Sequence, residues 1–147
     1  MSLIVQKFGG TSVGSIERIE QVADKVATFR ADGHSVVVVV SAMSGETNRL
    51  IGLAHEVQER PVPREMDVLV STGEQVTTAL LAMALNKRGL PAKSYNGSQV
   101  RILTDDAHTK ARIKEIADAR LHADLAQGYV IVVAGFQGVD ERGNITT

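Results

Sequence analysis

Short hydrophobic runs alternate with longer amphipathic stretches along the whole chain. The runs over residues 3–8 and 36–40 are rich in β-branched side chains, which predicts strands. The second run is five consecutive valines, and because it lacks polar alternation we expect it to be covered on both faces. Two further strands are predicted over residues 92–95 and 129–134.

Between the strands, hydrophobic residues recur every three or four positions, which is typical of amphipathic helices. The four helices predicted on this basis cover residues 15–30, 46–58, 64–88 and 111–126. In the second helix we expect Leu50, Leu53 and Val57 to face inward. In the third, the polar run 71–73 interrupts the hydrophobic stripe, which predicts a kink or a junction between two helices.

The alternation of strands and helices predicts an α/β fold, a mostly parallel sheet with helices on both faces. Ligands of such sheets bind beyond the carboxyl ends of the strands. The polar and glycine-rich loops after residues 8, 40, 95 and 134 all leave strands at that end, so we expect binding residues there. The final residues, 145–147, are β-formers with no closing helix, which indicates an interrupted architecture.

Composition and charge narrow the possible partners. The net charge is −1, from 16 basic and 17 acidic residues, so we expect no binding to nucleic acid or to an anionic membrane. The longest hydrophobic run is far shorter than the roughly 20 residues of a membrane span. The chain has no cysteine, which fits a cytoplasmic protein. Its four scattered histidines show no metal-site spacing. Nothing in the composition argues against a homo-oligomer.

The strongest candidate for chemistry is the end of the first strand, where Lys7 and Phe8 precede Gly9 and Gly10. Paired glycines before a helix expose backbone N–H groups to an anion, and the lysine adds a positive charge. The spacing differs from both the P-loop and the G-x-G-x-x-G fingerprint. We therefore favour a phosphate-binding loop of another type. The alternative is a solvated lysine followed by a tight turn.

Two other segments carry candidate binding residues. Ser41 follows the valine strand, and Thr47 lies in the first turn of the next helix, where free N–H groups attract carboxylate or phosphate. The alternative for this loop is helix capping by Ser44 or Thr47. Glu74, beside the interruption in the long helix, is a candidate to bind a substrate ammonium. The alternative, which the residues alone favour, is an exposed helical glutamate.

Two loops are harder to interpret. In residues 135–138 the glycines allow close approach of the backbone to a ligand, whereas Phe136 is expected in the core. Residues 105–106, two adjacent aspartates, superficially suggest a metal pair. We expect them instead to open a loop and cap the next helix.

Six short stretches, taken together and in order, resemble the N-terminal part of the aspartate kinases, a family of the amino-acid-kinase superfamily. They are Val5–Val13 (VQKFGGTSV), Val38–Met43 (VVVSAM), Arg64–Asp67 (REMD), Gly73–Glu74, Gly97–Gln99 (GSQ) and Val133–Val139 (VAGFQGV). The resemblance spans nearly the whole chain. It implies the amino-acid-kinase fold and transfer of phosphate from ATP, with Mg²⁺, to the side-chain carboxylate of L-aspartate.

The resemblance also implies roles for individual residues. Lys7 would be the catalytic residue that holds the ATP phosphates, with Phe8, Gly9 and Gly10 beside it, and Ser41 would lie at the junction of nucleotide and substrate. The aspartate-binding residues would be Thr47 and Glu74, with Glu74 on the α-ammonium. No protein metal ligand is implied. Because a carboxylate acceptor is already ionised at neutral pH, no general base is needed.

Such kinases continue into a nucleotide-binding lobe and regulatory ACT domains, which residues 1–147 do not include. The resemblance therefore implies that these residues form an incomplete, substrate-side lobe with little activity alone, from an enzyme opening the route to lysine, threonine and methionine. Two alternatives remain. One is another kinase of the superfamily, for acetylglutamate or glutamate, and the other is a non-catalytic interaction module.

Overall fold

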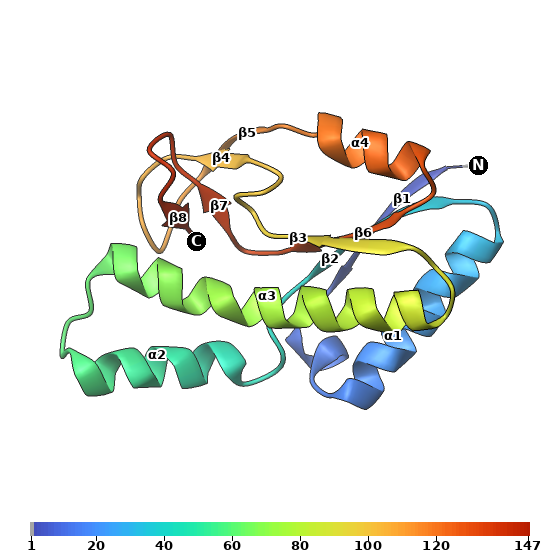
Figure 1. Ribbon diagram of the computed structural model, residues 1–147. Helices are drawn as coiled ribbons and strands as arrows, with labels where there is room; N and C mark the ends of the chain where they lie inside the picture. Colours follow the sequence, from blue (N-terminus) through green and yellow to red (C-terminus); the bar gives the residue numbers. More distant parts are fainter. Residues whose placement is uncertain (1) are drawn as a thin grey trace.

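A four-stranded parallel sheet, sheet A, forms the centre of the structure, which is a computed structural model describing residues 2–147 (Figure 1). In spatial order its strands are β1 (Leu3–Phe8), β2 (Ser35–Val40), β6 (Val130–Ala134) and β3 (Ala92–Tyr95). Every neighbouring pair is parallel. The carboxyl ends of all four strands therefore lie along one edge, as the sequence predicts.

Helices cover both faces of sheet A. On one face α1 (Ile16–Ala31) and α3 (Pro63–Lys87) pack against Val36, Val38 and Val132, which are fully buried. On the other face α4 (Ala119–Ala126) packs against the alternate side chains, including Ile131. The unbroken hydrophobic runs of β2 and β6 thus have a partner on each side. The predicted α/β class is confirmed.

A second sheet, sheet B, lies beside the first half of α3 (Figure 1). Its strands are, in spatial order, β5 (Ile113–Ile116), β4 (Ile102–Thr104), β7 (Gly138–Val139) and β8 (Ile145–Thr146). The β4–β7 pair is parallel and the two outer pairs are antiparallel. These strands are very short, and the sequence predicts only β8, from the β-forming residues 145–147.

The helix predicted over residues 111–126 is wrong in its first half. Ile113 and Ile116 belong to β5, and only the second half of the segment is helical, in α4. A spacing of three fits one face of a helix, but here backbone pairing with β4 determines the structure. Asp105 does open the loop before β5, accepting hydrogen bonds from the N–H groups of Ala107 and Arg112, but there is no helix for it to cap.

Helix α3 is continuous through the polar run 71–73, so the predicted interruption is wrong. The Ser71 hydroxyl donates to the carbonyl of Val68, and the Thr72 hydroxyl donates to that of Leu69, so both are satisfied within the helix. Among the described residues, α3 is the one helix long and hydrophobic enough to cross a membrane. Core helices share these properties, and more than half of that stretch is buried inside the fold.

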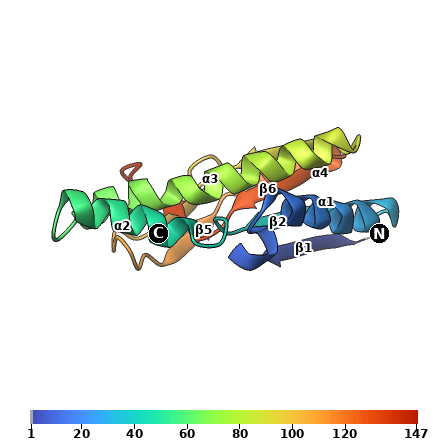
Figure 2. The ribbon, with the colours of Figure 1, turned by 90° about the horizontal axis from the view of Figure 1, so that it is seen from below.

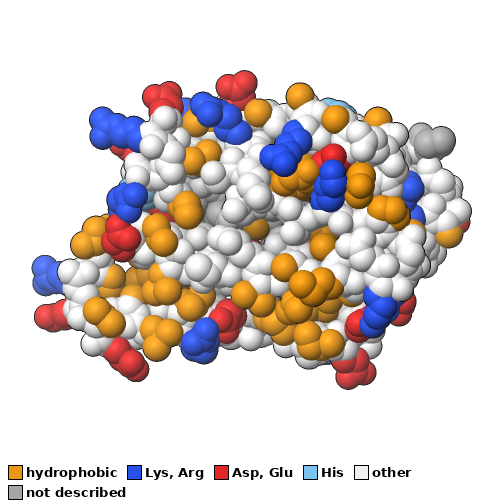
Figure 3. All heavy atoms as spheres, in the orientation of Figure 1, with side chains coloured by type: hydrophobic (Ala, Val, Ile, Leu, Met, Phe, Trp, Pro, Cys, Tyr) orange, Lys and Arg blue, Asp and Glu red, His pale blue; other side chains and the backbone are white. Residues whose placement is uncertain are grey.

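Helix α2 (Glu46–Val57) runs alongside the first half of α3, as two perpendicular views show (Figures 1 and 2). Of its three predicted inward residues only Leu50 is buried, whereas Val57 is 90% exposed. Leu53 and Val57 line a hydrophobic groove of about 300 Å³ between the two helices. Hydrophobic side chains gather over this part of the surface, at the lower left of Figure 3.

Candidate functional site

The loops at the carboxyl ends of three sheet A strands are joined by backbone hydrogen bonds. The N–H of Ser44, after β2, donates to the carbonyl of Gly10, after β1, over 3.1 Å. The N–H of Gly135, after β6, donates to the carbonyl of Val40 over 2.9 Å. A Cβ on Gly10 would lie 3.0 Å from the carbonyl oxygen of Ala42, so glycine permits this close approach.

Helix α3 packs directly onto the loop after β2, and Gly73 makes that contact possible. A Cβ on Gly73 would lie only 2.8 Å from the Cβ of Ala42, closer than real side chains approach. The neighbouring residue, Glu74, is thereby brought to the edge of the same loop. The glycine that suggests a helix break in the sequence instead serves helix-to-loop packing.

These contacts surround a pocket of about 340 Å³ at the edge of sheet A, which is open to solvent. Four of the predicted site residues line it, namely Gly10, Ser41, Thr47 and Glu74. The other lining residues are Ala42, Met43, Ser44, Gly45, Asn48 and Phe136. Lys7, Phe8 and Gly9 do not line this pocket, although they immediately precede Gly10. The structure thus brings together the two predicted aspartate-binding residues with part of the predicted nucleotide loop.

The three remaining predicted residues differ in their surroundings. Lys7 is exposed at the end of β1 and forms no ion pair with any carboxylate of residues 2–147. The Phe8 side chain packs against the core, so a contact with a ligand would fall to its backbone. Gly9 is exposed, has an ordinary φ of −77°, and a Cβ there would meet no atom within 4 Å. Neither its backbone conformation nor its packing requires glycine.

The N-terminus of α2 opens onto the pocket. No side chain caps the helix, so the capping alternative for Ser44 and Thr47 is wrong. The N-cap position is Gly45, whose φ of 83° is the left-handed conformation that glycine adopts readily. Thr47 and Asn48 of the first turn line the pocket. Uncapped N–H groups at a helix start favour a bound anion.

Glu74 is buried, so the exposed alternative that its sequence context favours is wrong. Its residue surface is 6% exposed, and no Lys, Arg or His of residues 2–147 forms an ion pair with it. Burial raises the pKa of Glu74 to about 7, and hydrogen bonding to Gln137 and the backbone of Ala42 only partly opposes this rise. A buried carboxylate is stabilised when a cationic group lies beside it.

Two neighbouring residues of the loop after β6 have opposite surroundings, and the core position predicted for Phe136 is wrong. Phe136 is 75% exposed, with a φ of 60°, and lines the pocket instead of joining the core. Gln137 is buried and donates from Nε2 to the carbonyl of Ser71 over 3.0 Å. Its Nε2 also lies 3.4 Å from Oε2 of Glu74. In the sequence Gln137 stands out only as part of the stretch 133–139, and the residues alone indicate no role for it.

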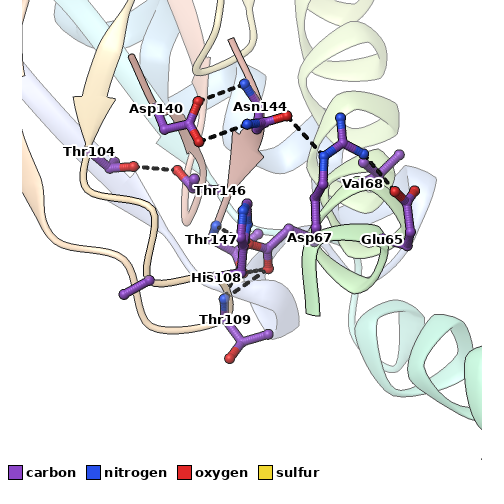
Figure 4. A network of polar contacts seen from close by, with 12 residues as sticks. Glu65, Asp67, Val68, Thr104, His108, Thr109, Asp140, Asn144, Thr146 and Thr147 are labelled. Atoms are coloured by element: carbon purple, nitrogen blue, oxygen red, sulfur yellow. Dashed lines mark hydrogen bonds and ion pairs between the residues drawn. The ribbon is translucent and has the colours of Figure 1, made fainter. Parts of the chain in front are cut away.

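A buried polar cluster joins α3 to sheet B (Figure 4). Asp67, which is fully buried, accepts hydrogen bonds from the N–H of Thr109 and from both the N–H and the hydroxyl of Thr147. Nδ1 of His108 lies 2.8 Å from its Oδ2. The role of His108 is therefore structural.

The spacing of polar residues in the sequence indicates the buried polar face of α3. Asp67, Ser71, Glu74 and Thr78 are spaced by four, three and four residues, and all four are buried. Such spacing places polar side chains on one face of a helix. Within the part of the chain that the structure describes, no group of three or more His, Asp or Glu side chains is placed to hold a metal ion.

Comparison with known proteins identifies one family for this chain. The amino acid kinase family model matches residues 2–147. The chain is 74% identical to an aspartokinase of Pseudomonas aeruginosa over 147 residues, which is all of this chain and 36% of that protein. It is 54% identical over 147 residues to an aspartokinase of a Bacillus species, again spanning 36% of its length. The chain thus spans about a third of these curated relatives.

Solved structures of aspartate kinases superpose on this chain. The crystal structure of an aspartate kinase from Synechocystis superposes with a TM-score of 0.82 at 46% identity, covering 99% of this chain and 23% of that one. E. coli aspartokinase III in complex with aspartate and ADP superposes with a TM-score of 0.86 at 25% identity, covering 100% of this chain and 43% of that one. With a family match along nearly its whole length, the chain belongs to the amino acid kinase family.

Proposed function

We propose that this chain is the substrate-side part of an aspartate kinase, a cytoplasmic enzyme of amino-acid biosynthesis. The reaction transfers the γ-phosphoryl group of ATP to the side-chain carboxylate of L-aspartate, giving 4-phospho-L-aspartate and ADP. The observation that carries the proposal is the buried carboxylate of Glu74, which has no ion-pair partner within residues 2–147. It lies beside the N-terminus of α2, which no side chain of the described residues caps. The names of the relatives and the aspartate in the E. coli structure support it.

The pocket offers complementary groups for the two kinds of charge on aspartate. Glu74 would bind the α-ammonium, which supplies the cation that its burial calls for. The N–H groups at the start of α2, with the Thr47 hydroxyl, would bind a carboxylate. Aspartate carries both kinds of group, whereas a simple dicarboxylate lacks the ammonium and would leave Glu74 unpaired.

The nucleotide would lie on the β1 side of the pocket. Lys7, an exposed cation that forms no ion pair within residues 2–147, would bind ATP phosphates together with the backbone of Phe8, Gly9 and Gly10. Ser41 would lie between nucleotide and amino acid. Mg²⁺ would bind the ATP phosphates and would neutralise their charge.

This arrangement suits transfer to a carboxylate. The acceptor is ionised at neutral pH, so the residues need only hold it in line and stabilise charge on the transferring group. Lys7 and the N–H groups at the start of α2 would supply positive potential to the transferring phosphoryl group. Glu74 orients the acceptor through its ammonium, remote from the reacting carboxylate.

The two loop glycines should respond differently to alanine. Gly9→Ala adds a methyl group where the fold has open space, so we expect unchanged stability but about 10-fold or greater loss of nucleotide affinity. Gly10→Ala places a Cβ 3.0 Å from the carbonyl oxygen of Ala42 and should destabilise the fold by about 1–3 kcal/mol. Urea denaturation and titration with Mg·ATP distinguish the two. Equal nucleotide affinity of G9A and the unmodified chain would remove Gly9 from the phosphate site.

The proposed reaction is tested by ADP release in the presence of Mg·ATP and L-aspartate. We expect the polypeptide encoded by the whole reading frame to release ADP with aspartate and not with N-acetylglutamate or glutamate. Residues 1–147 alone should show little turnover, since they span 36% of the length of the relatives. Robust turnover by these residues alone would contradict the assignment as a partial catalytic unit, and preference for another acceptor would contradict the proposed substrate.

A further inference from the structure

The side chain of Gln137 is held in one orientation by partners on two different elements. Its Nε2 donates to the carbonyl of Ser71 on α3, and its Oε1 accepts from the N–H of Gly97 over 3.3 Å. Rotating the amide by 180° would set the oxygen against a carbonyl and the NH₂ group against an N–H. The amide therefore presents its donors to α3.

The backbone around Gln137 is fixed as closely as its side chain. A Cβ on Gly97 would lie 2.5 Å from the carbonyl oxygen of Gln137. A Cβ on Gly138 would lie 2.6 Å from the carbonyl oxygen of Ile102. Two glycines thus allow the loop after β6 to pack tightly against the segment after β3. The position of the Gln137 amide is set by the fold before any ligand binds.

The fixed amide is directed at Glu74. Its Nε2 lies 3.4 Å from Oε2 of Glu74, a long contact that a small movement of the carboxylate would shorten. Gln137 is itself buried, so water does not readily replace it as a donor. We propose that Gln137 is the positioning residue for Glu74: it holds the carboxylate toward the pocket and favours the ionised form that a substrate ammonium requires. The inference rests on the proposed role of Glu74.

Few other charges face Glu74. The remaining pocket residues, from the loops after β1, β2 and β6 and from the start of α2, contribute no titratable side chain. Glu46, in the first turn of α2, pairs with Arg49 at 2.6 Å. On α3 itself, Asp67 is hydrogen-bonded to Thr109 and Thr147, in segments that flank sheet B. Loss of the Gln137 donor should therefore change the titration of Glu74 without compensation from a neighbouring charge.

The test is the pH titration of the Glu74 carboxyl carbon by NMR, without substrate. In Gln137→Met the donor is lost, so we expect the midpoint to rise by about 1 pH unit. In Gln137→Glu, which keeps an acceptor for the N–H of Gly97, two carboxylates compete for one proton and the apparent midpoint should rise further. Gln99→Met is the control. Within residues 2–147 the Gln99 side chain bonds only to the backbone of Asn96, so its replacement should leave the Glu74 midpoint unchanged.

A midpoint equal to that of the unmodified chain, in whichever Gln137 variant folds, would overturn the inference. A purely structural role for Gln137 would lower stability without moving the Glu74 titration. Because the measurement needs no ligand, failure of the chain to bind aspartate would count against the proposed function alone.

Discussion

Replacing Glu74 with glutamine should reduce the affinity for L-aspartate by about 100-fold or more. The variant keeps the size of the side chain but removes the negative charge, so a bound ammonium would lie in a buried site without a counter-charge. Removing one partner of a buried ion pair typically costs about 3–5 kcal/mol, and every 1.4 kcal/mol is a tenfold change in affinity. Titration calorimetry or NMR shift mapping with L-aspartate measures the loss.

The same variant should be more stable than the unmodified chain at high pH when no ligand is present. Burial raises the pKa of Glu74 from 4.5 to about 7, so its stabilising contribution is complete below pH 4.5 and is lost as the pH rises through 7. Glutamine does not titrate. The stability advantage of Glu74→Gln should therefore grow between these pH values and reach about 1–3 kcal/mol above them.

Urea denaturation at pH 5 and pH 8 tests this prediction. Glu56→Gln is the matched control, because Glu56 is exposed on α2 and its substitution should leave the pH profile unchanged. Parallel profiles for Glu74→Gln and Glu56→Gln would mean that Glu74 does not carry a raised pKa. Such a result would remove the electrostatic reason for assigning it an ammonium ligand.

Replacing Asp67 with alanine should destabilise the fold by about 3–5 kcal/mol, a large share of the stability of a small domain. Asp67 is fully buried, and its carboxylate gathers donors from Thr109 and Thr147 together with the ring of His108 (Figure 4). Alanine leaves these groups buried without their acceptor. It also removes the contacts that hold the segments flanking sheet B against α3.

Asp67→Asn and Asp106→Ala complete the experiment. Asparagine keeps one acceptor oxygen, so its loss of stability should be intermediate. Asp106 is an exposed aspartate in the same loop as His108, and its replacement should change the free energy of unfolding by less than about 0.5 kcal/mol. Equal urea midpoints for Asp67→Ala and Asp106→Ala would show that the cluster does not stabilise the fold.

The central architecture could be predicted because its signals are local. Five consecutive valines indicate a strand covered on both faces, and β2 is central in sheet A with helices on either side. The convergence of the loops that follow the strands comes from the general rule for parallel sheets, whereas the order β1-β2-β6-β3 is not predicted from the sequence. Four of the predicted site residues, from two of these loops and from α2 and α3, do line one pocket, although Lys7, Phe8 and Gly9 lie outside it.

The features that could not be predicted depend on contacts between distant segments. Ile113 and Ile116 have helical spacing but pair with β4, because partnering with a strand satisfies their backbone. Gly73 suggests a break in a helix until its contact with Ala42 is known. The burial of Glu74 follows from that same packing. The sequence does contain one further signal, the spacing of Asp67, Ser71 and Glu74, which marks a polar face on a buried helix.

The most direct test of the account is the pKa of Glu74 measured by NMR in the presence of L-aspartate or succinate. Both ligands carry two carboxylates, but only aspartate has an ammonium. We predict that excess aspartate lowers the pKa of Glu74 from about 7 toward its ordinary value, while succinate does not. An unchanged pKa with aspartate, or the same change with succinate, would contradict the claim that Glu74 receives the substrate ammonium.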